Sequence, residues 1–293
     1  MEEQNAYANW LNDRYPFDSE ARNKPLEDKV LDYLKPKQDL QLLDVGAGTG
    51  SNTLYLMDKI KSNQHWYLVE QNPSFKNIFF RRIEDFSNFH KYEWTRSNNK
   101  IQISTPTKEL SFEFIEGSLL EVAQLLPLEN IDLVLANAVF DLFSKQQIQQ
   151  FLNPILQKEI ACYFTLNYKS QSFLPEDPFD STYISLYEDH MERPQAMGTA
   201  TGKMVGPYLS ECLETFQIVE QAISTWQIQK EDIKMHYYLL SFMENAIQEL
   251  ALQEEVKSLL PKWIQRKKDM VITRQLELRV QHWDIFSYPR LNE

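Results

Sequence analysis

The sequence predicts an α/β fold in which a mostly parallel β-sheet carries helices on both faces. Short apolar runs alternate with segments of helical periodicity, at the spacing of parallel βαβ units. A chain of 293 residues is long enough to bury a substantial core, so we expect one main domain with added segments. The apolar runs that predict parallel strands are 40–45, 66–69, 110–115, 131–135 and 160–166.

The chain begins with two stripes of apolar residues at helical spacing. The first stripe, around Trp10, predicts a short helix that Pro16 ends, and the second predicts a helix that closes before Pro36. We therefore expect residues 1–36 to form an N-terminal helical cap and residues 37–293 to form the main domain.

Three segments depart from simple strand–helix alternation. A turn-prone run of serine and asparagine predicts an inserted β-hairpin at about 90–108. A polar stretch with prolines and aromatics, followed by spaced glycines, predicts a long loop or lid at about 170–206. Apolar residues at helical spacing predict a helical insertion at about 230–270, and alternation over 275–286 predicts a last strand.

Composition bears on possible partners. The formal charge of −12 repels a polyanion at long range, so nucleic acid is a disfavoured partner unless a local basic patch compensates. The longest apolar runs are too short to cross a bilayer, and the first residues show no secretory pattern, so we expect no membrane association. The two cysteines and five histidines show no metal-ligand spacing, and we expect reduced thiols in a cytoplasmic protein.

A glycine-rich loop joins the first predicted strand to the next helix. Three of the seven glycines fall within five residues of this loop. Glycine permits positive φ and lets a ligand touch the backbone, although a tight structural turn would also use it. A dinucleotide-binding G-x-G-x-x-G pattern would need glycine at Ser51, so the spacing favours another cofactor. The loop consists of Asp44, Val45, Gly46, Ala47, Gly48, Thr49 and Gly50.

This D-x-G-x-G-x-G loop resembles motif I of class I S-adenosylmethionine (SAM)-dependent methyltransferases. Glu70 lies twenty residues beyond Gly50, at the end of the second strand, where a carboxylate can accept hydrogen bonds from ribose hydroxyls. NAD sites use the same device, so the glycine spacing is what separates the two cofactors. The resemblance implies a Rossmann-like, seven-stranded sheet with one antiparallel strand, SAM as cofactor, S-adenosylhomocysteine (SAH) as product, and no metal.

Two further segments extend the resemblance. Residues 114–119 end the third strand, where the family places a polar group at the adenine, and residues 131–138 resemble motif IV, which faces the transferred methyl. Arg14 in the cap is a candidate partner of the SAM carboxylate, with a surface position as the alternative. The expected cofactor-binding residues are Arg14, Asp44, Gly46, Ala47, Gly48, Gly50, Glu70, Gln71, Glu116, Ser118, Leu119, Asn137 and Ala138.

Two residues are catalytic candidates. Asp141 follows the fourth strand, where it could act as a general base or instead cap the next helix. His190 lies in the predicted lid among acidic neighbours, although a loop histidine often faces solvent. The sequence Asn137-Ala138-Val139-Phe140 differs from the Asn-Pro-Pro-Tyr signature of methyltransferases that act on planar amides and nucleobase amines.

The interpretation that follows is a methyltransferase acting on a small molecule, at oxygen or nitrogen. Methyl transfer from a sulfonium depends mainly on holding the acceptor in line and excluding water, so few catalytic residues are needed. An RNA or protein methyltransferase is the first alternative. A non-catalytic SAM-binding or scaffolding protein, whose helical C-terminal third binds a partner, is the second.

Overall fold

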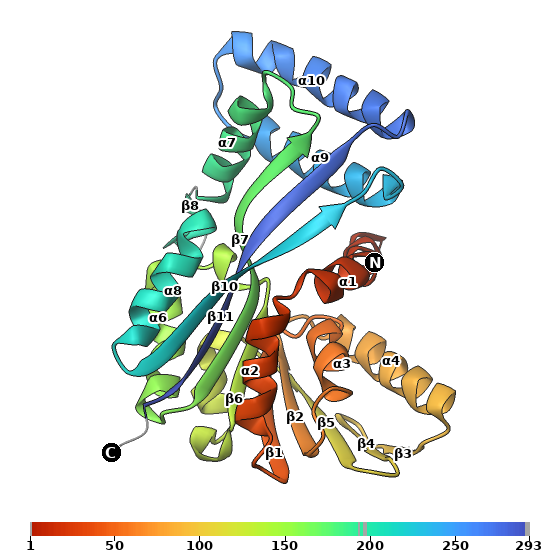
Figure 1. Ribbon diagram of the computed structural model, residues 1–293, viewed down its shortest axis with the longest axis vertical. Helices are drawn as coiled ribbons and strands as arrows, with labels where there is room; N and C mark the ends of the chain where they lie inside the picture. The colour runs from red at the N-terminus through yellow and green to blue at the C-terminus, as the bar shows by residue number, and fades with distance from the viewer. Residues whose placement is uncertain (1, 193, 196–197, 291–293) are drawn as a thin grey trace.

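A computed structural model describes residues 2–192, 194–195 and 198–290, and it contains one large sheet flanked by helices (Figure 1). The strand order in this sheet is β10-β11-β7-β6-β1-β2-β5-β4-β3. Neighbours within the central five strands pair in parallel, which confirms the five strands expected from the apolar runs. These strands are β1 (Asp39–Val45), β2 (Asn63–Glu70), β5 (Glu109–Glu116), β6 (Leu133–Asn137) and β7 (Ala161–Leu174).

The two remaining strands of the expected seven, β11 and β10, follow β7 in this order at one side of the sheet. β11 (Glu277–Pro289) pairs antiparallel with β7 and with β10 (Gln217–Ile228), as the resemblance implied for the last strand. The sheet has nine strands, where seven and a separate inserted hairpin were expected. The predicted hairpin, β3 (Glu93–Arg96) and β4 (Lys100–Ser104), pairs with the open edge of β5 and so joins the sheet.

Helices cover both faces of the sheet, as predicted. Alternate residues of β1 divide between two cores, with Leu42 on one face and Leu43 on the other. The first core includes α2 (Lys24–Leu34), α3 (Ser51–Met57) and α4 (Ser74–His90), and the second includes α6 (Lys145–Gln157) and α8 (Val205–Glu214). The shorter helices are η1 (Leu119–Glu121), α5 (Val122–Leu125), η2 (Leu128–Asn130), η3 (Phe140–Leu142) and η4 (Gly202–Met204).

The N-terminal helix α1 (Glu2–Ala21) continues through Pro16, so the prediction that Pro16 ends a short helix is wrong. Proline has a helical φ and removes one N–H, a loss that packing can offset. Trp10 makes edge contacts with Tyr238 and Phe242 at centroid distances of 5.1 and 5.0 Å, which anchor the helix on the N-terminal side of the proline. The cap is therefore one long helix followed by α2.

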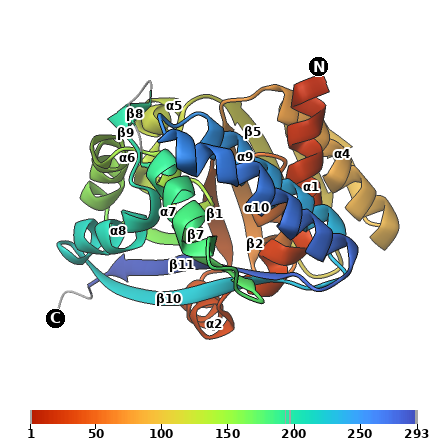
Figure 2. The same ribbon diagram turned by 90° about the horizontal axis from the view of Figure 1, so that it is seen from above.

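Three helices form a third layer over extended strand ends (Figures 1 and 2). They are α7 (Asp180–Met191), α9 (Ile233–Gln248) and α10 (Glu254–Ile272), and they share a core with the upper halves of β7, β10 and β11. The helical insertion expected at 230–270 is thus present. None of the described helices is both long and apolar enough to cross a bilayer.

The prediction of a long loop at 170–206 is largely wrong, because most of this segment is strand or helix. β7 continues to Leu174 because its polar residues pair with β11, and α7 follows after a short turn. Two short strands, β8 (Pro194–Gln195) and β9 (Gly198–Thr199), precede η4. Met197, which we expected in the glycine-containing part of this loop, lies outside the described residues.

Candidate functional site

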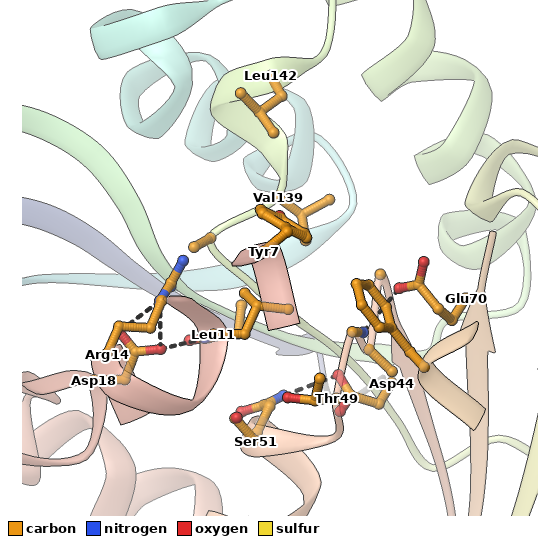
Figure 3. A pocket seen from close by; sticks show the side chains of 17 residues that line it. Tyr7, Leu11, Arg14, Asp18, Asp44, Thr49, Ser51, Glu70, Val139 and Leu142 are labelled. Atoms are coloured by element: carbon orange, nitrogen blue, oxygen red, sulfur yellow. Dashed lines mark hydrogen bonds and ion pairs between the residues drawn. The ribbon is translucent and has the colours of Figure 1, made fainter. Parts of the chain in front are cut away.

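A cavity of about 190 Å³ lies over the carboxyl ends of β1, β2 and β6. α1 closes one side of it with Tyr7, Leu11, Arg14 and Asp18. Figure 3 shows Arg14 and Glu70 on opposite sides of the cavity, with Leu11 and Tyr7 between them. Carboxyl ends of parallel strands are where ligands bind in open α/β sheets, so the position agrees with the fold. The predicted residues that line the cavity are Arg14, Asp44, Gly46, Ala47, Gly48, Glu70, Asn137 and Ala138.

The glycine loop has a backbone that requires glycine at two positions. Gly46, Gly48 and Gly50 have φ values of 61°, 55° and 78°. A Cβ on Gly50 would lie 2.1 Å from Phe79 Cδ2, and one on Gly46 would lie 2.8 Å from Val139 Cγ2. The loop is therefore pressed against its neighbours, and the Gly46 and Gly48 backbone faces the cavity.

Asp44 anchors this loop from below. Its Oδ1 accepts a hydrogen bond from Asn52 Nδ2 at 2.9 Å, and its Oδ2 accepts one from the Thr53 hydroxyl at 2.8 Å. Burial raises the pKa of Asp44 to about 6, although these two donors and the charge of Arg22 oppose the rise. The carboxylate thus ties the end of β1 to the start of α3 and fixes the shape of the loop.

Glu70 holds the other side of the loop. Its Oε2 accepts a hydrogen bond from the Gly48 backbone N–H at 2.8 Å, and its Oε1 accepts one from the Asn72 N–H at 2.8 Å. Each carboxylate oxygen has a second lone pair, so the group can also accept from a ligand hydroxyl. Its neighbour Gln71 is exposed and does not line the cavity.

A hydrogen-bond network connects α1 to the carboxyl end of β6. Arg14 Nε contacts Asp18 Oδ2 at 3.0 Å, and the same oxygen accepts from Asn137 Nδ2 at 3.3 Å. The buried Arg22 donates through one NH2 group to Asn137 Oδ1 at 3.2 Å and to Asn52 Oδ1 at 2.7 Å. The sequence analysis missed Asp18, Arg22 and Asn52, although the i, i+4, i+8 spacing of Arg14, Asp18 and Arg22 places them on one helical stripe.

The residues expected near the adenine lie beside the cavity and do not line it. Glu116 is exposed at the end of β5, in register with Glu70 on β2. The Ser118 hydroxyl accepts from the Leu120 N–H at 3.2 Å and caps η1, while Leu119 is buried in the core. Gly50 also lies outside the lining, whereas Phe75, which the sequence analysis missed, belongs to it.

The two catalytic candidates lie in different places, one next to the cavity and one away from it. Asp141 lies in η3 between Val139 and Leu142, which both line the cavity. It does not cap α6, because Ser144 does so through a capping box with Gln147. His190 does not lie at the cavity. It is near the end of α7, where its Nε2 is 3.2 Å from Glu249 Oε2.

Ionisable side chains across the described part of the chain form no group of three or more that could hold a metal ion. No family model matches the sequence, and no curated protein matches it either.

Several solved structures are similar to this chain in fold. The YcgJ protein from Bacillus subtilis is 12% identical, with 90% of this chain and 98% of that chain covered and a TM-score of 0.46. The cyclopropane synthase MmaA2 from Mycobacterium tuberculosis is 11% identical, with 89% and 82% covered and a TM-score of 0.42. The likeness concerns the fold. A geranyl diphosphate C-methyltransferase from Streptomyces coelicolor, solved with S-adenosyl-L-homocysteine, is 9% identical, with 91% and 78% covered and a TM-score of 0.40.

Proposed function

We propose that this chain is a SAM-dependent methyltransferase that acts on a small molecule. The observation that carries the proposal is the cavity itself, which brings the glycine loop, Glu70 and Arg14 together from three separate parts of the sequence. Glu70 and Arg14 lie at opposite sides, as a ligand with a ribose at one end and a carboxylate at the other would require (Figure 3).

The residues present fit the cofactor. Glu70 would accept from the ribose hydroxyls, and the Gly46 and Gly48 backbone would lie against the ligand without a Cβ between them. Arg14 binds Asp18 through Nε, and its two NH2 groups have no hydrogen-bond partner among the described residues, so a carboxylate can take them. Gln71, Glu116, Ser118 and Leu119 stay predictions for the adenine end.

When bound, the cofactor would supply a methyl group that is carried on a sulfonium. After the transfer, its sulfur would remain as a neutral thioether. The chain's own part is to hold the acceptor in line and to exclude water. Leu11, Val139 and Leu142 give the cavity apolar surface. Asp141, next to this surface, is the candidate base for an acceptor that must lose a proton.

A small acceptor fits this lining better than nucleic acid does. The charged residues that line the cavity are three carboxylates, Asp18, Asp44 and Glu70, and one guanidinium, Arg14. A phosphate backbone would meet repulsion here as well as from the net charge of −12. We also propose a reducing, cytoplasmic setting, which the two free cysteines Cys162 and Cys212 support.

A thermal-shift titration with SAM, SAH and NAD tests the cofactor assignment. At about a hundred times its dissociation constant, a ligand that binds the folded state adds about 2.7 kcal/mol of stability. We expect SAM and SAH to raise the melting temperature and NAD to leave it unchanged. Stabilisation by NAD with none by SAM or SAH would refute the proposal.

Glu70→Gln separates specific from unspecific binding. The amide keeps the shape of the side chain but loses the charge that strengthens hydrogen bonds to ribose, so SAH affinity should fall about tenfold. Glu214→Gln makes the same change at an exposed position at the end of α8 and should leave the affinity unchanged. Equal effects of the two variants would show that SAH binds elsewhere.

A further inference from the structure

Asp141 is a carboxylate that the cofactor contacts described above do not use. It follows β6 and Asn137, on a short helical turn, and its sequence neighbours Val139 and Leu142 line the cavity. Figure 3 shows Val139 and Leu142 beyond Tyr7, on the side away from Thr49 in the glycine loop. Asp141 does not itself line the cavity, but these neighbours place it directly behind this side of the cavity.

One oxygen of this carboxylate lacks a partner. Asp141 Oδ1 is buried and accepts no hydrogen bond from the described residues. Burial raises the pKa of Asp141 to about 6, while its own backbone N–H and the charge of Arg14 oppose the rise. A buried carboxylate oxygen without a donor is costly, so this oxygen requires a partner that a bound ligand can supply.

The charge of Asp141 acts on three tyrosines from different parts of the chain. Its charge contributes, after burial, to raising the pKa of Tyr7 on α1, Tyr168 on β7 and Tyr187 on α7. The Tyr168 hydroxyl already donates to Glu188 Oε1 at 3.1 Å, and the other two hydroxyls have no partner among the described residues. Of the three tyrosines, Tyr7 lines the cavity, and an aromatic ring near a carboxylate is a surrounding that binds organic cations.

The positive charges nearby leave room for a further cation. Arg14 acts on Asp141, but its Nε pairs with Asp18 at 3.0 Å, and its NH2 groups are assigned above to the carboxylate of the cofactor. His282 is neutral at physiological pH, because burial and the charge of Arg14 lower its pKa to about 3. An anionic acceptor would instead face the carboxylates of Asp141 and Asp18.

From this geometry we infer that the methyl acceptor is an amine, bound as an ammonium ion at the Asp141 carboxylate, beside the ring of Tyr7 in the cavity. The inference rests on the function proposed above and narrows its substrate class. Arg14 then serves the carboxylate of the cofactor, and Asp141 serves the cation of the acceptor, so each charged end of the two ligands meets an opposite charge.

The basicity of Asp141 favours an amine over an alcohol. An alkylammonium such as that of lysine has a pKa of about 10.4, whereas water, which resembles an alcohol, has a pKa of about 15.7. The pKa of Asp141, raised to about 6, is much nearer to the pKa of the alkylammonium than to that of water. Proton transfer from an ammonium to Asp141 is therefore far less uphill than transfer from a hydroxyl.

The reaction balances with these groups and a sulfonium methyl donor. The ammonium gives one proton to the Asp141 carboxylate, and the freed nitrogen lone pair forms a bond to the methyl carbon. The carbon–sulfur bond of the donor breaks, and its electron pair stays on sulfur as a neutral thioether. Asp141 then releases the proton to solvent, so one ammonium and one sulfonium yield a methylated ammonium, a thioether and a proton.

Binding to the SAH-loaded protein tests the inference with three probes of one shape. Benzylamine is a cation, benzyl alcohol is neutral and benzoate is an anion, and calorimetry gives their affinities at pH 7.5. We expect benzylamine to bind at least tenfold more tightly than the other two. Asp141→Asn should lower the affinity for benzylamine at least tenfold and change the affinity for benzyl alcohol by less than twofold. Asp28→Asn makes the same charge change on an exposed face of α2 and should alter neither affinity.

The outcomes separate the two proposals. If SAH does not bind, the proposed function fails. If SAH binds but benzylamine shows no measurable binding, no preference over benzoate or no dependence on Asp141, the amine assignment alone is overturned. Should Asp141→Asn not fold, the native protein still decides: benzylamine affinity should fall at least tenfold from pH 7.5 to pH 4.5 as Asp141 is protonated, and a flat profile would refute the assignment.

Discussion

The ion pair between Lys267 and Asp180 allows a sharp test of how the third helical layer is held. Lys267 is fully buried on α10, and its Nζ lies 2.7 Å from Asp180 Oδ1 and 2.8 Å from Oδ2. Trp263 Nε1 and the Asp177 N–H also donate to this carboxylate, each at 2.8 Å. Asp180 begins α7, so the pair fixes the helix that carries Tyr187 against α10.

Lys267→Met removes the cation and keeps the length of the side chain. Breaking a buried ion pair costs about 3 to 5 kcal/mol, and we expect the lower end because Asp180 keeps two donors. Burial lowers the pKa of Lys267 and Asp180 opposes this, so part of the pair's attraction already offsets desolvation. With an unfolding entropy of about 2.1 cal/mol/K for each of 293 residues, 3 kcal/mol lowers the melting temperature by about 5 °C.

Arg266→Met is a matched control at the preceding position. Arg266 pairs with Asp177 at 2.9 Å, but its side chain is 45% exposed, so the loss should be at most about 1 kcal/mol. Urea unfolding at pH 7.5 measures both variants. A second change, Asp180→Asn in the Lys267→Met background, removes the unpaired charge and should recover stability. If Lys267→Met costs no more than Arg266→Met, or if the double variant is less stable still, the reasoning is wrong.

Three further predictions concern the site. Gly50→Ala should destabilise by about 2 to 5 kcal/mol in urea unfolding, because φ is 78° and a Cβ would lie 2.1 Å from Phe79. The folded state keeps a proton on Asp141 up to a pKa of about 6, so this group lowers the stability of the native protein as the pH rises from 4 to 6. The free energy of unfolding of Asp141→Asn, compared with that of the native protein, should therefore increase over this range by at most about 1.4 kcal/mol per pH unit. A difference that stays constant with pH would contradict this. Arg22→Met should lower SAH affinity at least fivefold in calorimetry, because it frees Asn52 from its 2.7 Å hydrogen bond; unchanged affinity would contradict the role of the network.

The central sheet and the glycine loop were predictable because their signals are local. Strands buried on both faces require continuous apolar runs, and β1 and β6 show them plainly. The glycines could be predicted because a positive φ and close neighbours exclude other residues at Gly46 and Gly50. Glu70 followed from its distance along the chain, since one helix and one strand separate it from the loop.

The upper part of β7 and the helix α7 were not predictable in this way. Residues such as Ser170 and Gln171 are polar, and their extended conformation comes from pairing with β11 more than a hundred positions later, as Gln171 does with Val280. α7 has no strong apolar stripe, and its position depends on Asp180 meeting Lys267 from α10. A loop was the natural expectation for a polar segment whose partners are remote in sequence.

The same limit explains why the N-terminal helix was underestimated, and it bears on how the site works. Arg14 and Asp18 lie on one stripe of α1 and Arg22 directly follows the helix, yet Pro16 argued against a continuous helix. The partners of Arg22 lie far away in the sequence, with Asn52 at a separation of 30 positions and Asn137 at 115. Because Asn52 holds Asp44 under the glycine loop and Asn137 ends the strand at the opposite wall, α1 braces both walls of the cavity. A segment that first looks like a separate cap is thus a structural part of the cavity that we propose as the cofactor site.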